Sequence, residues 1–210
     1  MKWFVNVAIG CLLLGACNAT DLAPLPATLD PTAGQVEVVP VSDPGIAKAA
    51  ARKDTLGRLL QAAKPTIGVP YKWGGTQMDE GIDCSNYTWQ LYRSIGMAYD
   101  RFVSSRALSR LKRANGLRKI SFEDALPGDL LVYGFRDEAG RWRGHVVILV
   151  DKDGSITGHK GLVLGAHGGS IGEVQYVTFS GFEKAYFKNP QMRLANVLRV
   201  DGTHEKGDVD

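Results

Sequence analysis

The chain has 210 residues and 44% hydrophobic content, which is enough for one compact domain with its own core. Its formal net charge of +3 argues against both a dedicated nucleic-acid-binding protein and a protein with an acidic tail. We therefore expect a single domain that works as a monomer, without a nucleic-acid partner.

Residues 1–16 have the pattern of a secretory signal peptide. Lys2 gives a positive start, and the apolar run 3–14 is too short to span a bilayer. Residues 14–17, Leu-Gly-Ala-Cys, resemble the lipobox of bacterial lipoproteins, whose cysteine becomes an acylated N-terminus. We expect Cys17 to anchor an exported protein to the membrane, although an ordinary signal peptide with a chance cysteine is the alternative. Asn18 does not resemble the Asp signal for inner-membrane retention, which in a Gram-negative host favours the periplasmic face of the outer membrane.

The three cysteines then have separate fates. Cys11 would leave with the signal peptide and Cys17 would carry lipid, so Cys84 would be the only free thiol of the mature chain. An unpaired thiol is a liability in an oxidising compartment unless it has a function. No disulfide or Cys-x-x-Cys metal site can form in such a chain, and the four histidines are scattered, so we expect neither a metal nor an organic cofactor.

Residues 17–45 contain repeated prolines that block regular structure, and we interpret them as a tether. The folded domain is expected over residues 46–200, with a frayed polar tail at 201–210. Its first element is an amphipathic helix from Ile46 to Lys64, which stops before Pro65.

The chain is organised around the motif Tyr-Lys-Trp-Gly-Gly at residues 71–75 and a helix that begins at Cys84. Trp73 beside paired glycines suggests an aromatic platform next to backbone that something approaches closely; a tight turn with a core tryptophan is the alternative. Asp83 is a natural N-cap, and Gly96 is expected to end the helix.

A thiol in the first turn of a helix faces unpaired N–H groups and the positive end of the helix dipole. Such sites lower a cysteine pKa from about 8.5 to about 3.5–7.5 and favour the thiolate. We therefore expect Cys84 to be a nucleophile, and a buried structural thiol is the alternative.

After this helix, Ser104 or Ser105 is expected to cap a second helix that runs to Ala114 and ends at Asn115-Gly116. Residues 101–119 carry basic side chains and no acidic one. Such a segment could attract an anionic polymer or stem-peptide carboxylates, but it is more often a solvated helix face, and we favour that interpretation. Residues 121–124 resemble a capping box for one short helical turn.

The second half of the domain is predicted to be strands. Helices first and then an antiparallel meander indicate an α+β fold, with the cysteine helix packed on the sheet. The apolar run that starts at His145 must be largely buried. Strands are expected at 130–135, 145–150, 162–166, 172–179 and 192–200, with a loop at 137–140 and a hairpin turn at 151–154.

A cysteine nucleophile needs a base and a group that orients this base. His145, at the start of a strand, is the best base, although a lone histidine is more often a structural residue. His167 lies among glycines and is the first candidate for the orienting group, with His159 as its competitor; His204 falls in the tail.

Four ordered motifs carry a resemblance to a known family. They are residues 70–75, 83–85, 127–131 and 144–148, and together they resemble the successive motifs of the NlpC-type cell-wall cysteine peptidases. The resemblance implies a papain-like α+β fold with Cys84 as nucleophile and His145 as base. It also implies that Tyr71 lies beside the nucleophile and that Trp73, Asp83 and Ser85 line the substrate site.

Two positions depart from the family pattern. Asn86 stands where many members have glycine. The usual third residue would fall at Gly165, with His167 displaced by two positions, and a two-residue shift in a strand keeps the same face. His167 is therefore still expected to orient His145, with His159 in reserve.

The family's usual substrate is the stem peptide of bacterial peptidoglycan, commonly cut at the γ-D-glutamyl to diamino-acid bond. We expect this activity. The alternatives are a cysteine amidase or acyltransferase on the same fold, and a non-catalytic lipoprotein that binds cell wall.

Overall fold

The computed structural model describes residues 44–97, 99, 102–111, 113–114, 116–137, 139–181 and 192–201. The predicted signal peptide, Cys17, most of the tether and His204 lie outside these residues. Within the described part of the chain, no helix has the length and apolar character needed to cross a bilayer.

The architecture is α+β, as predicted. Helix α1 spans Pro44–Ala63 and continues into the short 3-10 helix η1, Lys64–Thr66. The predicted helix at 46–64 is confirmed, and the α-helix ends before Pro65 because proline cannot donate the hydrogen bond that continues a helix.

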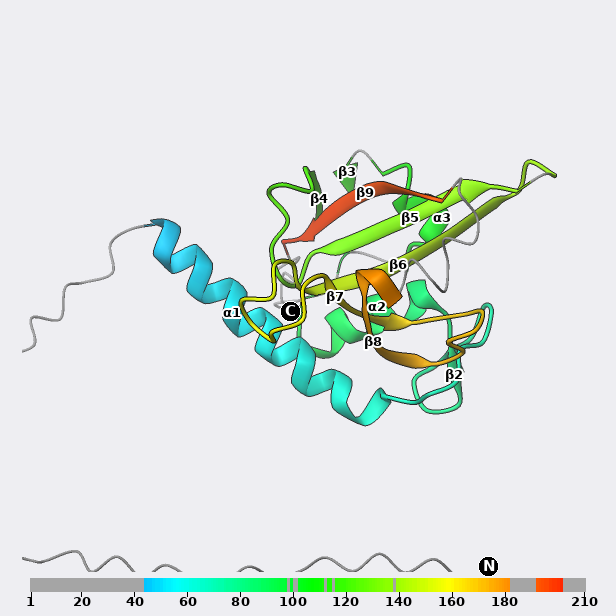
Figure 1. Cartoon of the computed structure of the whole chain (residues 1–210), viewed down its shortest axis with the longest axis horizontal. Coiled ribbons are helices and arrows are strands. Elements are labelled where there is room, and N and C mark those ends of the chain that lie inside the picture. Colours follow the sequence, from blue (N-terminus) through cyan, green and yellow to red (C-terminus); the bar gives the residue numbers. More distant parts are fainter. Residues whose placement is uncertain are drawn as a thin grey trace, which may run out of the picture. The chain divides into compact units, whose positions relative to one another are not determined.

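Seven strands in the described residues form one sheet in which all neighbours are antiparallel (Figure 1). Their spatial order is β3-β4-β9-β5-β6-β7-β8. The prediction of a simple meander was therefore wrong, because the last strand lies between β4 and β5. The strands are β3 (Arg113–Ala114), β4 (Leu117–Ile120), β5 (Leu130–Arg136), β6 (Trp142–Asp151), β7 (Leu162–Ala166), β8 (Val174–Thr178) and β9 (Arg193–Val200).

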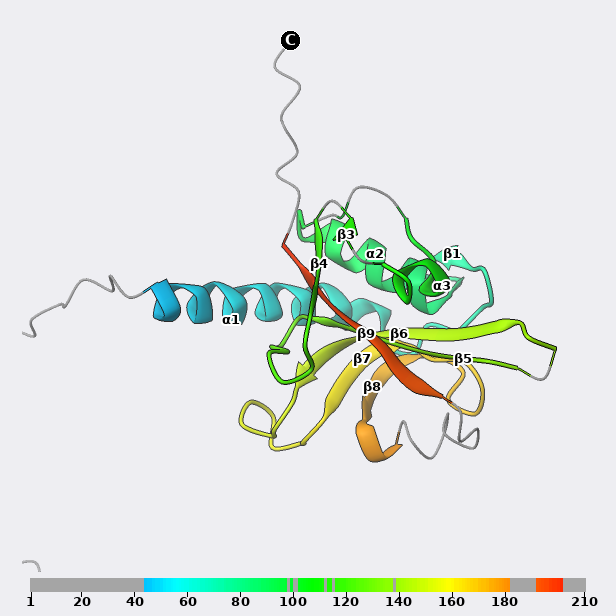
Figure 2. The same ribbon diagram turned by 90° about the horizontal axis from the view of Figure 1, so that it is seen from above.

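The two faces of this sheet are buried against different partners. Helices α2 (Cys84–Ser94) and α3 (Ser105–Leu108) lie together on one side in Figure 2. Val146 and Ile148 of β6 pack in the core cluster on the helical side. Val147 and Leu149 belong to a second cluster, against which the partly buried Phe122, Phe135 and Phe179 pack. Burial on both faces explains why β6 has a continuous apolar sequence.

The second predicted helix is much shorter than expected. Ser104 caps α3 through its side chain, but the helix ends at Leu108, so the prediction of a helix as far as Ala114 was wrong. Strand β3 instead pairs with β4, with Ala114 opposite Leu117. An Asn-Gly pair between two extended segments favours a tight hairpin, and Gly116 has the positive φ of +74° that such a turn needs.

Two predicted turns also differ in detail. The Ser121 hydroxyl accepts the N–H of Asp124 as in a capping box, but the segment forms a turn and no helix. The predicted hairpin turn at 151–154 is the start of a longer loop, which ends at Leu162, where β7 begins as predicted. The Asp151 carboxylate organises this loop by accepting the N–H groups of Gly154, Ile156 and Thr157.

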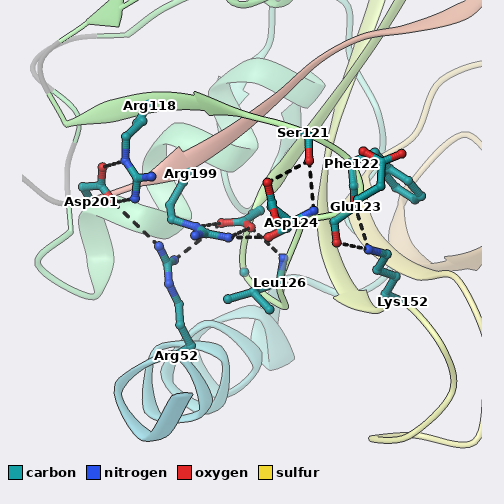
Figure 3. A network of polar contacts seen from close by, with 12 residues as sticks. Arg52, Arg118, Ser121, Phe122, Glu123, Asp124, Leu126, Lys152, Arg199 and Asp201 are labelled. Atoms are coloured by element: carbon teal, nitrogen blue, oxygen red, sulfur yellow. Dashed lines mark hydrogen bonds and ion pairs between the residues drawn. The ribbon is translucent and has the colours of Figure 1, made fainter. Parts of the chain in front are cut away.

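An ionic network joins α1 to the sheet (Figure 3). Arg199 of β9 donates two hydrogen bonds, of 3.0 and 2.7 Å, to the fully buried carboxylate of Asp129. Arg52 of α1 lies 3.6 Å from the same carboxylate and 3.7 Å from Asp201, which also pairs with Arg118. The network therefore links α1, β4, β9 and the turn before β5.

Candidate active site

Cys84 is the first residue of α2, and its position is fixed by the cap. The Asp83 carboxylate accepts the N–H of Asn86 at 2.8 Å and the hydroxyl of Ser85 at 2.9 Å. The predicted N-cap is thus confirmed. The start of the helix is also tied to the preceding loop, because Asp83 donates its N–H to the carbonyl of Gly75 at 3.0 Å.

The paired glycines serve the chain's own backbone. Strands β1 (Thr76–Gln77) and β2 (Gly81–Ile82) form a small ribbon next to α2. A Cβ atom on Gly75 would lie 2.5 Å from the carbonyl oxygen of Gly81, so no larger residue fits there. The close approach expected at this motif is therefore between two parts of the same loop.

The two candidate histidines meet across neighbouring strands. Nε2 of His145 in β6 lies 3.2 Å from Nδ1 of His167, which directly follows β7. The register explains this contact: Ile148 pairs with Leu164, and three residues further the same register places 145 opposite 167. His159, the competing candidate, is exposed in the loop between β6 and β7.

The hydrogen-bond partners define which nitrogens carry protons. Nε2 of His167 lies 3.1 Å from the carbonyl oxygen of Gln175, which can only accept. Neutral His167 is therefore protonated on Nε2, and its Nδ1 is an acceptor. His145 must then donate from Nε2, which leaves its Nδ1 unprotonated. A neutral imidazole in this state is a base.

The thiol of Cys84 lies against β6, the strand that carries His145. Cys84 is 4% exposed, and the backbone N–H of Val146, the residue after His145, acts on its sulfur. Burial raises the pKa of Cys84 to about 12, and the charge of Asp83 adds to the rise. The N–H groups of Val146, Ser85 and Cys84 itself oppose this rise without overcoming it.

The expected thiolate at the helix start was therefore wrong for the ligand-free protein. The backbone N–H groups of Cys84 and Ser85 at the helix start do lower the pKa of the thiol, but removing the sulfur from water has the larger effect. The histidines are also kept in their neutral forms: burial, and then His167, hold the pKa of His145 well below its usual value. Burial lowers the pKa of His167 to about 4, although its bond to Gln175 acts in the opposite direction. At neutral pH the site is a neutral thiol beside two neutral imidazoles.

Cys84 lines a cleft with a volume of about 540 Å³. The four residues predicted to bind substrate, Tyr71, Trp73, Asp83 and Ser85, all line this cleft together with Cys84. The side chain of Trp73 is 72% exposed, which excludes a core tryptophan. The lining is Tyr71, Trp73, Gly74, Thr76, Asp83, Cys84, Ser85, Asn86, Phe102, Ser104, Ser105, Arg106, Trp142 and Gly144.

Tyr71 is a neutral hydrogen-bond donor in this cleft. Burial, and then the charges of Cys84 and Asp83, raise its pKa above the usual value. Its ring packs over Gly168, where a Cβ atom would lie 3.0 Å from the ring carbon Cε1. This contact connects the loop before α2 with the segment that carries His167.

Trp142 is a lining residue that sequence reasoning missed. Its indole covers two glycines that face each other across β5 and β6, Gly134 and Gly144. A Cβ atom would lie 1.9 Å from the indole on Gly134 and 2.4 Å from it on Gly144. Two glycines in otherwise apolar strands were the available signal, because glycine inside a strand often marks a close approach.

The wall formed by Phe102, Ser104, Ser105 and Arg106 was also missed, because we predicted a solvated helix face for this region.

In the described residues no group of three or more His, Cys, Asp or Glu side chains is arranged to hold a metal ion.

Comparison with known proteins agrees with this geometry. The model of the NlpC/P60 family matches residues 68–194, more than half of the chain. A γ-D-glutamyl-L-lysine dipeptidyl-peptidase of Bacillus subtilis (strain 168) is 27% identical over 106 residues, which are 50% of this chain and 30% of that protein. A probable endopeptidase of Corynebacterium glutamicum is 29% identical over 110 residues, which are 52% of this chain and 49% of that protein.

The chain thus spans about half or less of the length of these curated relatives. A solved Staphylococcus aureus structure, described as similar to a lipoprotein of the NLP/P60 family, has 20% identity and a TM-score of 0.50. The similarity covers 70% of this chain and 41% of that one, and it concerns the fold. The matched region contains Cys84, His145 and His167, and the chain belongs to the NlpC/P60 family, whose members are cysteine peptidases.

Proposed function

We propose that the protein is a cell-envelope cysteine peptidase that hydrolyses an amide bond in peptidoglycan stem peptides, at the γ-D-glutamyl to diamino-acid bond. One observation carries the proposal: Cys84 lines a cleft at the N-terminus of a helix that packs on β6, the strand whose His145 is hydrogen-bonded to His167. The family match and the names of the relatives support a peptidase that acts on peptidoglycan.

The first step begins from neutral groups. The Cys84 sulfur attacks the amide carbonyl carbon while its proton moves to Nδ1 of His145. The hydrogen bond from Nε2 of His145 to His167 stabilises the imidazolium that forms. His145 thus acts as a general base in the attack, and no thiolate has to exist beforehand.

The charge on the carbonyl oxygen needs donors. The N–H of Cys84 lies in the first turn of α2, where backbone donors have no acceptor within the helix, and Tyr71 supplies a hydroxyl in the same cleft. His145 then gives its proton to the leaving amine, and a thioester remains on Cys84. Water, activated by His145, hydrolyses this thioester and restores the thiol.

The test is digestion of purified peptidoglycan by the full chain and by Cys84→Ala, with products identified by mass spectrometry. New amino and carboxyl termini that require Cys84 are expected, and their masses name the bond. Cleavage between muramic acid and L-alanine would instead identify an amidase, and transfer to an acceptor other than water would identify an acyltransferase. Equal products from both proteins would refute a cysteine mechanism. An absence of products, together with retained binding of the full chain to purified peptidoglycan, would favour a cell-wall-binding protein.

We also propose that the protein is anchored through a lipid on Cys17, at the periplasmic face of the outer membrane. The support is the sequence alone: the positive start, the short apolar run and the Leu-Gly-Ala-Cys motif at 14–17. Labelling cells with a fatty-acid analogue tests this directly. The wild-type protein should take up label and Cys17→Ser should not; equal labelling of the two would refute the anchor.

A further inference from the structure

The cleft beside Cys84 has two charged side chains of opposite sign among its described lining residues, Asp83 and Arg106. Oδ1 of Asp83 accepts the two hydrogen bonds of the helix cap, from Ser85 and Asn86. Arg106 makes no ion pair in the part of the chain that the structure describes, and its side chain is exposed to solvent. The cleft thus presents an unpaired guanidinium to whatever binds next to the nucleophile.

The backbone that carries Arg106 is firmly held, although α3 is short. Leu108 is fully buried, and Asn196 of β9 donates a 2.8 Å hydrogen bond to the carbonyl of Leu108. The hydroxyl of Ser109 donates to the carbonyl of Arg106 at 2.7 Å. The anchor of α3 on the central strand therefore fixes where Arg106 enters the cleft wall.

We propose that Arg106 is a specificity-determining residue that binds a free carboxylate of the stem peptide next to the scissile bond. This inference rests on the proposed function and names a requirement of the substrate. A γ-linked glutamyl residue keeps its α-carboxylate free, a few bonds from the amide that is cut. A guanidinium pairs with such a carboxylate through two parallel hydrogen bonds, which an amide in the same place cannot replace.

Two synthetic stem peptides that differ at one group test the inference. One has the free glutamyl α-carboxylate, and the other has this group as a primary amide. The wild-type chain should cleave the acid with a kcat/KM at least about tenfold above that for the amide, since a hydrogen bond to a charged group is worth about 1.5–3 kcal/mol. Arg106→Gln should lose this preference by slowing cleavage of the acid alone.

Arg110→Gln is the matched control, because Arg110 is exposed one turn further along and does not line the cleft. It should leave both rates unchanged. Calorimetry with the Cys84→Ala background gives a second measurement that does not depend on turnover: the acid should bind at least about tenfold tighter than the amide, and Arg106→Gln should abolish the difference. Added salt should reduce the preference.

Each outcome decides between the claims. A wild-type preference that persists in Arg106→Gln, or equal cleavage and equal binding of the two peptides by the wild-type chain, overturns the role of Arg106 and leaves the proposed function intact. If the wild-type chain cleaves neither peptide nor peptidoglycan, the proposed function fails, and the calorimetric comparison alone decides whether Arg106 binds the carboxylate.

Discussion

His145 and His167 share one hydrogen bond whose direction is set by the carbonyl of Gln175 on the far side of His167. Because that carbonyl can only accept, the proton between the rings belongs to His145. Burial keeps both rings neutral at neutral pH. The pair is therefore ready to take up one proton, on the nitrogen of His145 that does not face His167.

This arrangement predicts that His167 acts by orienting His145. His167→Ala should lower kcat about 100-fold or more with little change in KM, because the base loses its partner and the substrate cleft is unchanged. His167→Asn offers an amide oxygen as acceptor and should recover part of the loss. His159→Ala should keep full activity, because His159 is exposed in a distant loop; a kcat loss in this variant and none in His167→Ala would contradict the assignment.

Stability should fall as the medium becomes acidic. The pKa of His167 is about 4 in the folded protein and about 6.5 in an unfolded chain, so the unfolded state binds more protons between these values. The free energy of unfolding should therefore decrease by about 3 kcal/mol between pH 6.5 and pH 4 through His167, and His145 acts in the same direction. Urea denaturation at several pH values measures this. His167→Asn should flatten the dependence, and an unchanged slope would contradict it.

The buried ion pair between Asp129 and Arg199 should be costly to break. Asp129→Asn leaves a buried guanidinium without its counter-charge and should lower the free energy of unfolding by about 3–5 kcal/mol in denaturant titrations. Arg118→Gln is the control at the exposed end of the same network, where the loss should be about 1 kcal/mol or less. Equal losses in the two variants would show that burial does not determine the energetics of the network.

Gly134→Ala should damage the cleft through Trp142. The new Cβ would overlap the indole, so the ring must move and the packing of the wall must change. A loss of about 1–3 kcal/mol of stability is expected, together with a lower kcat/KM. Gly57→Ala, in the middle of α1 with nothing near its Cβ position, should instead stabilise the protein by about 1 kcal/mol. Full stability and full kcat/KM in Gly134→Ala would refute the role of the glycine pair.

The elements that the sequence predicted well are those determined by local chemistry. The apolar runs of β5 and β6 lie where expected, and Asp83 caps α2 as its position implies. The prediction of a helix as far as Ala114 was wrong, because the pairing of β3 with β4 prevails over the local helical preference of this segment.

The prediction of a lowered pKa for the Cys84 thiol was wrong for a related reason. The helix start that was expected to lower this pKa consists of sequence neighbours of Cys84. The largest effect on the pKa is burial, which depends on parts of the chain that are distant in sequence. The cleft wall at Phe102 and Arg106 could likewise not be predicted from the sequence, because its position depends on the contact between Leu108 and Asn196, which are 88 residues apart.

The place of β9 between β4 and β5 has a consequence for biosynthesis. A nascent chain contains Cys84, His145 and His167 well before it contains residue 193, but until then β4 and β5 both lack β9, the strand that lies between them and pairs with each. The side chain of Asn196 is also missing, so α3 lacks the hydrogen bond that joins its last residue, Leu108, to β9. The ribosome therefore makes the reactive groups first and the strand that joins the two parts of the sheet last, which delays a complete cleft until nearly the whole chain has been made.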